Sequence, residues 1–321
     1  MCLYPRLITN PKYKANKKNG GNVPHMVDNR VGFVPIGCQN CIECLKKKGN
    51  EWRVRLQEEI KENKNGKFVT LTFSPESYKE LYEISKGEGY TKDNEIATTA
   101  TRRFLERWRK KNKKSVRHWL ITEIGGNRYE CIHLHGIIFG EIKEIKLHWK
   151  YGYVFIGNYV NEKTINYIIK YCTKKDEKHK TYKPIILTSA GIGKKYMNSH
   201  NAKLNKFNGE KTEEQYINRQ NKKTGLPIYY RNKLYTEEER EKLWIQKINK
   251  NIRWVCGEKI DISKNEKNYE KLLKYYQRKN IEWGYGNSEK NWEEEQYERE
   301  RRNLKQKQKI NRAKALANAG G

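Results

Sequence analysis

Two histidines separated by one residue are the first candidates for chemistry in this chain. His133 and His135 lie in CIHLHGIIFG (Cys131–Gly140), whose composition predicts a β-strand. Because side chains alternate across a strand, both imidazoles point to one face while Leu134 turns toward the core. Two imidazoles on one face can clamp a divalent metal ion. Two histidines that simply face solvent are the alternative interpretation.

A carboxylate strengthens the metal-site interpretation. Glu123 ends the preceding predicted strand, SVRHWLITEI (Ser115–Ile124), and the turn at Gly125–Gly126 allows this strand to pair with the histidine strand. A carboxylate beside two imidazoles suits Mg²⁺ or Mn²⁺ with open coordination positions. The alternative is a strand-end carboxylate that faces water.

One predicted helix combines phenols with ammonium groups. Asn161 is a suitable N-cap for a helix that runs to about Lys175. Spacings of i, i+3, i+4 and i+7 place four side chains on one face: Tyr167, Lys170, Tyr171 and Lys174. The opposite side is apolar and can pack on a sheet through Ile165, Ile168, Ile169 and Cys172. Phenols can act as nucleophiles, and adjacent lysines favour phenolate and neutralise phosphate charge. The alternative is a tyrosine-rich surface in a tyrosine-rich chain.

A run of three cysteines forms a second candidate metal site. The spacing of Cys38, Cys41 and Cys44 lets neighbouring thiolates converge on one tetrahedral ion, as in structural zinc sites. The fourth ligand has to come from elsewhere, either Cys2 or His25. Three reduced thiols at the start of a helix are the alternative. Seven cysteines in all are too sparse, and odd in number, for a secreted disulfide framework.

The strands and helices that position these residues follow a recognisable order. Strands are predicted at Phe68–Phe73, Ser115–Ile124, Cys131–Gly140 and Lys183–Ser189, and helices at about 96–111 and 161–175. This β-α-β-β-α-β order predicts an α+β fold of the ferredoxin or RRM type, an antiparallel sheet with both helices on one face. The order leaves out a further short strand at Tyr151–Gly157.

Three regions are predicted along the chain. Residues 1–60 read as an extended arm with the cysteine run and a helix from Leu45 to Ile60, and residues 61–200 as the sheet domain. Residues 201–321 read as a basic, mostly helical extension, with a hairpin near Ile252–Ile262 and a last helix from Trp292.

The charge of the chain predicts a nucleic-acid partner. Its 321 residues include 68 Lys and Arg against 38 Asp and Glu, a net charge of +30. Residues 160–235 are especially basic, and LPIYYRNKLY (Leu226–Tyr235) interleaves aromatic and cationic side chains as single-strand-binding surfaces do. Basicity that serves only solubility is the alternative. No apolar run approaches the length of a membrane span, and the start lacks the apolar segment of a secretory signal, so we expect no membrane association.

These motifs, taken together, carry a resemblance. HLHG on a strand with YIIKYCTK on a following helix resembles the HUH endonucleases, the rolling-circle replication initiators. More narrowly, the chain resembles replication initiator proteins of small single-stranded DNA phages of the Microviridae, gokushovirus type. The motifs that support this resemblance occur in order over about residues 2–235: MCLYP, CQNCIEC followed by EWRVRL, FVTLTF, ITEIGGNRYECIHLHG, YIIKYCTKK, SAGIGKKY and LPIYYRNKL.

The resemblance implies a metal-dependent, site-specific single-stranded DNA endonuclease and strand transferase. It implies that His133, His135 and Glu123 bind Mg²⁺ or Mn²⁺, that Tyr167 and Tyr171 are paired nucleophiles, and that Lys170 and Lys174 accompany them. Such a protein nicks a replication origin through a 5′-phosphotyrosine and frees a 3′-OH for a host DNA polymerase, in the cytoplasm of the bacterial host. FVTLTF matches the first motif, which the resemblance makes a core strand without a catalytic role.

Two other functions stay open at the level of sequence. One is a non-catalytic, zinc-stapled DNA-binding protein; the other is an HUH transposase or relaxase. Relaxases usually carry three histidines after the tyrosine, whereas the histidines come first here, and single-tyrosine transposases lack a partner for Tyr167. No GxxxxGK[ST] motif occurs, so we expect a host helicase to separate the strands.

Overall fold

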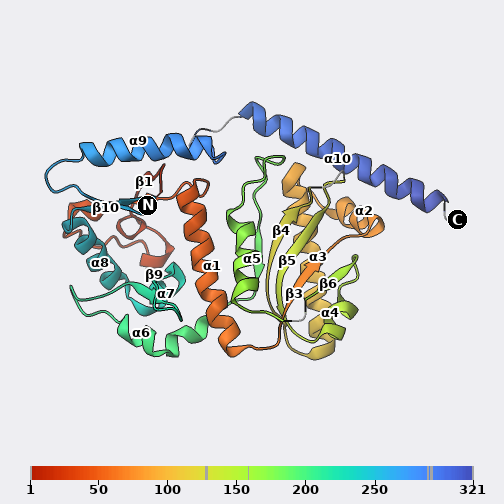
Figure 1. Ribbon diagram of the computed structural model, residues 1–321, viewed down its shortest axis with the longest axis horizontal. Coiled ribbons are helices and arrows are strands. Elements are labelled where there is room, and N and C mark those ends of the chain that lie inside the picture. The colour runs from red at the N-terminus through yellow and green to blue at the C-terminus, as the bar shows by residue number, and fades with distance from the viewer. Residues whose placement is uncertain (1, 127–128, 158, 288, 290–291, 320–321) are drawn as a thin grey trace. The chain divides into compact units, whose positions relative to one another are not determined.

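The computed structural model of the chain describes residues 2–126, 129–157, 159–287, 289 and 292–319 (Figure 1). The chain divides into two compact units, each built from segments distant in sequence. We call Arg55–Gly193 with Lys290–Gly321 the sheet unit, and Met1–Val54 with Lys194–Glu289 the cysteine unit. The predicted boundaries near 60 and 200 lie close to these divisions, but the final segment is grouped with the sheet rather than with the rest of the predicted extension.

A five-stranded antiparallel sheet is the framework of the sheet unit, which confirms the predicted α+β class. The strands lie in the order β6-β3-β5-β4-β7. Their bounds are β3 Gly66–Leu71, β4 Arg117–Ile124, β5 Ile132–Phe139, β6 Val154–Ile156 and β7 Ile186–Thr188. The predicted β4–β5 hairpin forms, with Glu123 directly opposite His133. Residues 127–128 of the predicted turn lie outside the described residues.

The edges of the sheet differ from the simple predicted order. The short strand β6, which that order left out, pairs with β3, whereas β7 pairs with β4 at the other edge. Backbone hydrogen bonds from Thr72 to Tyr153 and from Ser74 to Tyr151 continue the pairing of β3 with the segment before β6. That segment therefore occupies the open edge of β3, and only the open edge of β4 remains for β7.

One face of the sheet is covered by α2 (Pro75–Ile84) and α3 (Gly89–Asn112). The predicted apolar stripe of the second helix is buried here: Ala97, Ala100, Phe104 and Trp108. It packs with strand residues of one parity, among them Leu120 and Leu134. Two helices of this unit were not predicted: α2, which Ser74 caps and Pro75 begins, and α4 (Ile142–His148).

The opposite face of the sheet carries α5 (Glu162–Thr173), so the prediction that both helices share one face is wrong (Figure 1). Tyr171 of α5 stacks on His135, whose parity is opposite to that of Leu134. The physical reason lies in β4, where Trp119, Leu120 and Ile121 are all buried, so both faces of the sheet need cover. The predicted N-cap is confirmed, since the side chain of Asn161 accepts a hydrogen bond from the Thr164 backbone N–H.

The last helix, α10 (Trp292–Ala319), packs against α2 and α3 of the sheet unit. Its Arg302 is fully buried and donates to both carboxylate oxygens of Asp93 in α3, at 2.6 and 2.9 Å. Two ionised groups out of water need each other, so this pair ties α10 to α3. The pairing explains why the final segment leaves the predicted basic extension.

The cysteine unit contains small sheets and helices. Its pairs of antiparallel strands are β1 (Arg6–Thr9) with β2 (Phe33–Ile36), β8 (Gln215–Ile217) with β9 (Lys223–Gly225), and β10 (Ile252–Val255) with β11 (Glu258–Asp261). Its helices are the first part of α1 (Ile42–Glu62), α6 (His200–Leu204), α7 (Ile228–Leu234), α8 (Glu237–Asn249) and α9 (Lys267–Glu282). The predicted hairpin near 252–262 is confirmed, and the predicted extended arm instead pairs β1 with β2.

Tyrosines form much of the core of the cysteine unit. Tyr230 and Tyr235, from LPIYYRNKLY, are buried with Tyr196 and Tyr216. Their rings are therefore closed to nucleobases, and the prediction that this segment presents aromatic side chains to a single strand is wrong for these two. Among the helices that the structure describes, none is both long and apolar enough to span a bilayer.

Candidate active site

The structure brings the predicted metal ligands together on the α5 face of the sheet. One carboxylate oxygen of Glu123, Oε2, lies 2.9 Å from Nε2 of His133 and 2.8 Å from Nε2 of His135. The three ligand atoms lie within 4.8 Å of one another. The glycine of HLHG belongs to this geometry, because a Cβ at Gly136 would come within 2.0 Å of the Trp119 carbonyl oxygen. Only glycine allows β5 to lie this close to β4 beside the histidines.

Each imidazole is oriented through its other nitrogen. Nδ1 of His133 lies 3.2 Å from the Cys131 carbonyl oxygen, and Nδ1 of His135 lies 3.0 Å from Oγ1 of Thr70. Hydrogen bonds to the far nitrogen are the usual way in which proteins fix the rotation of a metal-binding histidine. Thr70 belongs to FVTLTF, so a strand predicted to be only structural also orients a candidate ligand.

The protonation pattern of this group fits a cation. A carbonyl oxygen only accepts, so Nδ1 of His133 has to carry the proton, and Nε2 of the neutral ring then has a lone pair. That lone pair faces a carboxylate oxygen 2.9 Å away, which repels it unless a proton or a metal ion lies between them. Burial raises the pKa of Glu123, but hydrogen bonds from His133 and His135 outweigh it and lower the pKa to about 2. One carboxylate and two imidazoles, converging in this way, are a donor set for a divalent cation.

The two tyrosines meet this group from α5. The ring of Tyr171 stacks on the ring of His135, with centroids 4.5 Å apart and planes 8° from parallel. The hydroxyl oxygens of Tyr167 and Tyr171 are 2.9 Å apart. Burial, the Tyr167 hydroxyl and the charge of Glu123 all raise the pKa of Tyr171, whereas Tyr167 is 48% exposed. The metal-ligand group and both phenols therefore form one continuous site.

The predicted lysines lie at the edge of this site. Lys170 and Lys174 are both exposed, and α5 ends at Thr173, so Lys174 is the C-cap rather than a member of the helical face. Both ammonium groups are near enough in sequence to the phenols to contact a polyanion that reaches them.

An aromatic surface beside the tyrosines was not predicted. Phe68 contacts the rings of Tyr167 and Phe155, with centroids 5.9 and 6.2 Å apart. Phe155 in β6 is 48% exposed. A signal was present in the sequence, because Phe68 and Thr70 alternate in FVTLTF and Phe155 lies in a predicted strand, but the pairing of these strands was not.

The four candidate zinc ligands also come together, in the cysteine unit. Cys2, Cys38, Cys41 and Cys44 place their sulfur atoms within 4.8 Å of one another. His25 is exposed and outside this group. Of the two candidates for the fourth ligand, the structure therefore selects Cys2.

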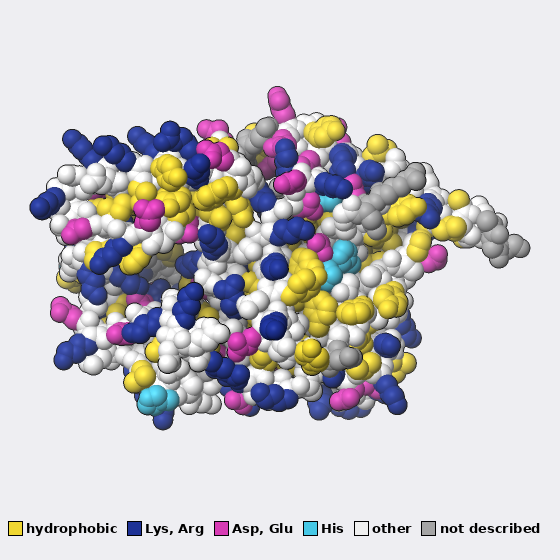
Figure 2. Space-filling model, viewed as in Figure 1, with side chains coloured by type: hydrophobic (Ala, Val, Ile, Leu, Met, Phe, Trp, Pro, Cys, Tyr) yellow, Lys and Arg dark blue, Asp and Glu magenta, His cyan; other side chains and the backbone are white. Residues whose placement is uncertain are grey.

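The excess of basic side chains is widely distributed. Figure 2 shows Lys and Arg side chains scattered over the visible face, with Asp and Glu among them, rather than gathered in one stripe. The net charge of +30 thus supplies general attraction for a polyanion, and the geometry for a reaction has to come from the site itself.

Comparison with known proteins agrees with a role in replication. Residues 66–176 match a family model of replication-associated proteins, the ORF2 type. The matched segment runs from the start of β3 to just beyond α5 and contains all the residues of the candidate active site: Glu123, His133, His135, Tyr167, Lys170, Tyr171 and Lys174. No curated protein and no solved structure matches the chain. The match supports a replication-associated protein.

Proposed function

We propose that this protein initiates rolling-circle DNA replication as a divalent-metal-dependent, site-specific endonuclease and strand transferase for single-stranded DNA, of the HUH type found in gokushovirus-like phages. One observation carries the proposal: Tyr171 stacks on His135, so a candidate nucleophile adjoins a candidate metal ligand. A solvent-facing tyrosine pair or a pair of structural histidines does not require this contact. The match of residues 66–176 to replication-associated proteins supports the biological role.

The chemistry follows from the residue types. A divalent cation held by Glu123, His133 and His135 supplies Lewis-acid polarisation of a non-bridging phosphate oxygen. The Oη atom of a tyrosine attacks the phosphorus, so an Oη–P bond forms and the P–O3′ bond breaks. The phenol loses its proton and the departing 3′ oxygen gains one. The products are a 5′-phosphotyrosyl link and a free 3′-OH, which primes a host polymerase.

The paired tyrosines support repeated strand transfer. The phosphotyrosine keeps the energy of the broken phosphodiester, so a 3′-OH can attack it and rejoin the strand without ATP. Once one tyrosine is linked to DNA, the second, whose hydroxyl lies 2.9 Å away, is available to cut the new junction after one circuit. The first 3′-OH then closes the displaced strand into a circle. A single tyrosine would need a second subunit for this alternation.

The test uses Tyr167→Phe, Tyr171→Phe and the double variant with a single-stranded origin oligonucleotide and Mn²⁺. We expect a covalent protein–DNA adduct from the wild type and none from the double variant. Peptide mass spectrometry of the adduct should locate the link on Tyr167 or Tyr171. Tyr297→Phe, a change to an exposed tyrosine of α10, is the matched control and should form the adduct normally. An adduct that persists in the double variant would contradict the proposal.

The same experiment separates the non-catalytic alternative. A zinc-stapled DNA-binding protein would bind the oligonucleotide equally well with and without the tyrosines and would form no adduct with either. A transposase or relaxase of the same type would form the adduct but would use a different DNA site. Cleavage of the origin of the chain's own genome, compared with a scrambled oligonucleotide, distinguishes that outcome.

A further inference from the structure

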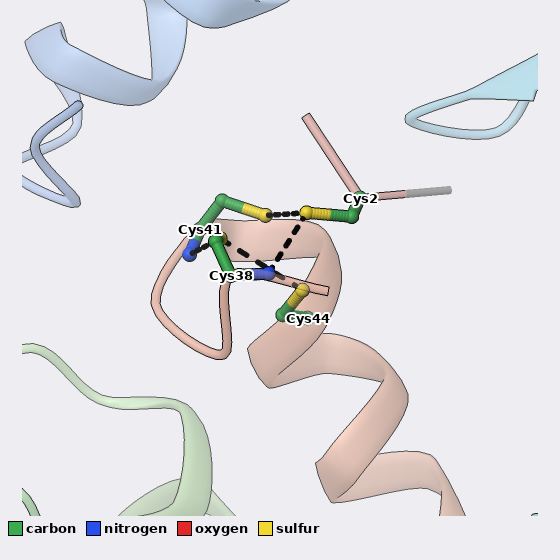
Figure 3. A group of neighbouring side chains, drawn as sticks. All are labelled: Cys2, Cys38, Cys41 and Cys44. Carbon is green, nitrogen blue, oxygen red and sulfur yellow. Dashed lines mark hydrogen bonds between the residues drawn. The ribbon is translucent and has the colours of Figure 1, made fainter. Parts of the chain in front are cut away.

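A second group of metal-binding side chains lies in the cysteine unit, outside the segment that matches replication-associated proteins. Cys2 precedes β1, Cys38 and Cys41 flank the turn before α1, and Cys44 lies in the first turn of α1 (Figure 3). Their sequence separation is large, since Cys2 and Cys38 are joined through β1 and β2. Four sulfur atoms nonetheless lie close to one another.

The separations between the sulfur atoms fit one tetrahedral ion. Cys38 Sγ lies 4.0 Å from Cys44 Sγ, and Cys41 Sγ lies 3.9 Å from Cys2 Sγ. With Zn–S bonds of about 2.3 Å, a regular tetrahedron places its sulfur atoms about 3.8 Å apart. A disulfide would need about 2.05 Å, and all four cysteines are free. An iron–sulfur cluster spreads its thiolates more widely than a single ion does.

The backbone around the sulfur atoms is arranged to stabilise thiolates. Backbone N–H groups of Cys38 and Tyr4 donate to Cys2 Sγ at 3.2 and 3.3 Å, and that of Cys41 donates to Cys38 Sγ at 3.3 Å. Gln39 adopts a left-handed backbone with φ of 64°, which turns the chain between Cys38 and Cys41. A Cβ at Gly37 would lie only 3.0 Å from Cys44 Sγ, so the chain passes directly over the group.

The thiols also carry an unequal charge balance. A hydrogen bond from Cys44 lowers the pKa of Cys41 to about 5, whereas the same contact and then burial raise the pKa of Cys44. One thiolate is thus stabilised by its neighbours, and further thiolates are opposed by like charge. A dication removes that opposition.

The surroundings have little apolar material to hold them together. The cluster that contains Cys41 has only Leu3 and Val255 as its other fully buried members among the described residues. Around it pack two-stranded sheets, which are marginal alone. A region with so small a core usually needs a metal or a disulfide.

We propose that Cys2, Cys38, Cys41 and Cys44 bind one structural zinc ion that fastens the N-terminal segment to the start of α1. The ion closes the long loop through β1 and β2 and holds Leu3 in the core. Gln277 of α9 donates to the Leu3 carbonyl at 2.8 Å, so the same ion fixes the position at which α9 docks. This site is separate from Glu123, His133 and His135 and does not depend on the proposed function.

The test measures metal content and coordination on the full-length chain purified without chelators. We expect one zinc per chain by mass spectrometry in the wild type, and at least a tenfold loss of affinity in Cys41→Ser. Cys256→Ser is the matched control, because Cys256 packs in the same cluster but lies outside the group of four. A His133→Ala, His135→Ala variant removes the other metal-capable group and should keep its zinc.

Cobalt substitution decides the ligands even if Cys41→Ser does not fold. The wild type and the double-histidine variant should both show intense sulfur-to-cobalt charge-transfer bands, which zinc then abolishes. Three outcomes would overturn the proposal: no thiolate-bound metal in the wild type, iron in place of zinc, or equal loss of zinc from Cys256→Ser and Cys41→Ser.

Discussion

Tyr167 and Tyr171 share one hydrogen bond but have different surroundings. Tyr171 is partly buried on the ring of His135, and Tyr167 is half-exposed beside Phe68. Because the two hydroxyls are in hydrogen-bond contact, a phenolate formed on one residue accepts a hydrogen bond from its neighbour. The second phenol thereby stabilises the charge of the first. The environment of each residue, rather than its chemical type, distinguishes the two.

Thr70 should control how well the metal ion binds. Thr70→Val keeps the shape of the side chain but removes the hydrogen bond that orients His135. Loss of such a bond typically lowers metal affinity about 10- to 100-fold. Calorimetric titration with Mn²⁺ should show that loss, and Thr70→Ser should restore most of it. Thr72→Val is the matched control, since the Thr72 hydroxyl donates to the Tyr153 carbonyl. Equal affinities for Thr70→Val and the wild type would exclude the orienting role.

Phe155 should hold a nucleobase next to the tyrosines. Its exposed ring lies in β6 against Phe68, which in turn contacts Tyr167. Base–aromatic stacking contributes about 1–3 kcal/mol per base, so Phe155→Ala should weaken binding of single-stranded DNA about 5- to 150-fold. Fluorescence anisotropy measures this, with Phe155→Trp expected to preserve binding. Tyr297→Ala on α10 is the control for loss of an exposed aromatic ring; if it weakens binding as much, stacking at Phe155 is not specific.

At the scale of elements, α10 supports the histidine strand from behind. Glu130, just before β5, has a left-handed backbone with φ of 45°, which is strained for a residue with a Cβ. Arg302 and Lys309 of α10 both donate to its carbonyl oxygen, at 2.9 and 2.8 Å, and Arg301 binds its carboxylate at 2.6 Å. These bonds hold the start of β5, and through it the position of His133.

Lys309 gives this contact a pH dependence. Burial, and then repulsion by Arg302, lower its pKa to about 8 despite the opposing charges of Asp93, Glu130 and Cys131. Between about 8 and the unfolded value near 10.5, the unfolded chain binds more protons at this residue than the folded one. The contribution of Lys309 to stability therefore rises with pH through that window and is least favourable below it.

Replacement by Met should reveal this dependence. The stability of Lys309→Met relative to the wild type should be constant below pH 8 and should fall as the pH rises to about 10.5, as measured by urea unfolding. The Glu130 carbonyl keeps its bond from Arg302 in the variant. Lys307→Met, at an exposed lysine of the same helix, is the control. A variant that instead gains stability relative to the wild type over that window would contradict the assigned pKa direction.

Local patterns predicted more of the site than of its supports. The period of two placed His133 and His135 on one face, and the helical period placed Tyr167 with Tyr171, because both relations depend only on near neighbours. The opposite placement of α3 and α5 was readable in the consecutive buried residues Trp119 to Ile121, but the predicted fold type overrode it. The bonds of Arg302 to Asp93 and of Thr70 to His135 join residues far apart in sequence, and no periodicity encodes them.

At the scale of the whole molecule, charge and geometry have separate tasks. The net charge of +30 attracts any polyanion, and Lys and Arg are spread over the visible surface rather than concentrated in one stripe (Figure 2). Specificity for a DNA site must then arise where Phe155, the tyrosines and the metal ligands act together. Binding strength and cutting should therefore respond to different conditions.

Salt should separate the two. For single-stranded DNA the slope of log affinity against log salt is about −0.7 per phosphate contacted, so six contacts predict a roughly 300-fold loss for a fourfold rise in salt. Adduct formation at saturating DNA should change far less over the same range. Anisotropy titrations and gel assays at matched salt measure both. A flat binding curve would show that the positive charge does not contact the DNA backbone.

The return of α10 to the sheet unit has a consequence for synthesis on the ribosome. The segment 194–289, which belongs to the cysteine unit, must be translated before α10 exists. Until then Asp93 has no Arg302, and Glu130 lacks the bonds that hold the histidine strand. A nascent chain therefore carries an unfinished nuclease, and cutting of DNA begins only after α10 has left the ribosome.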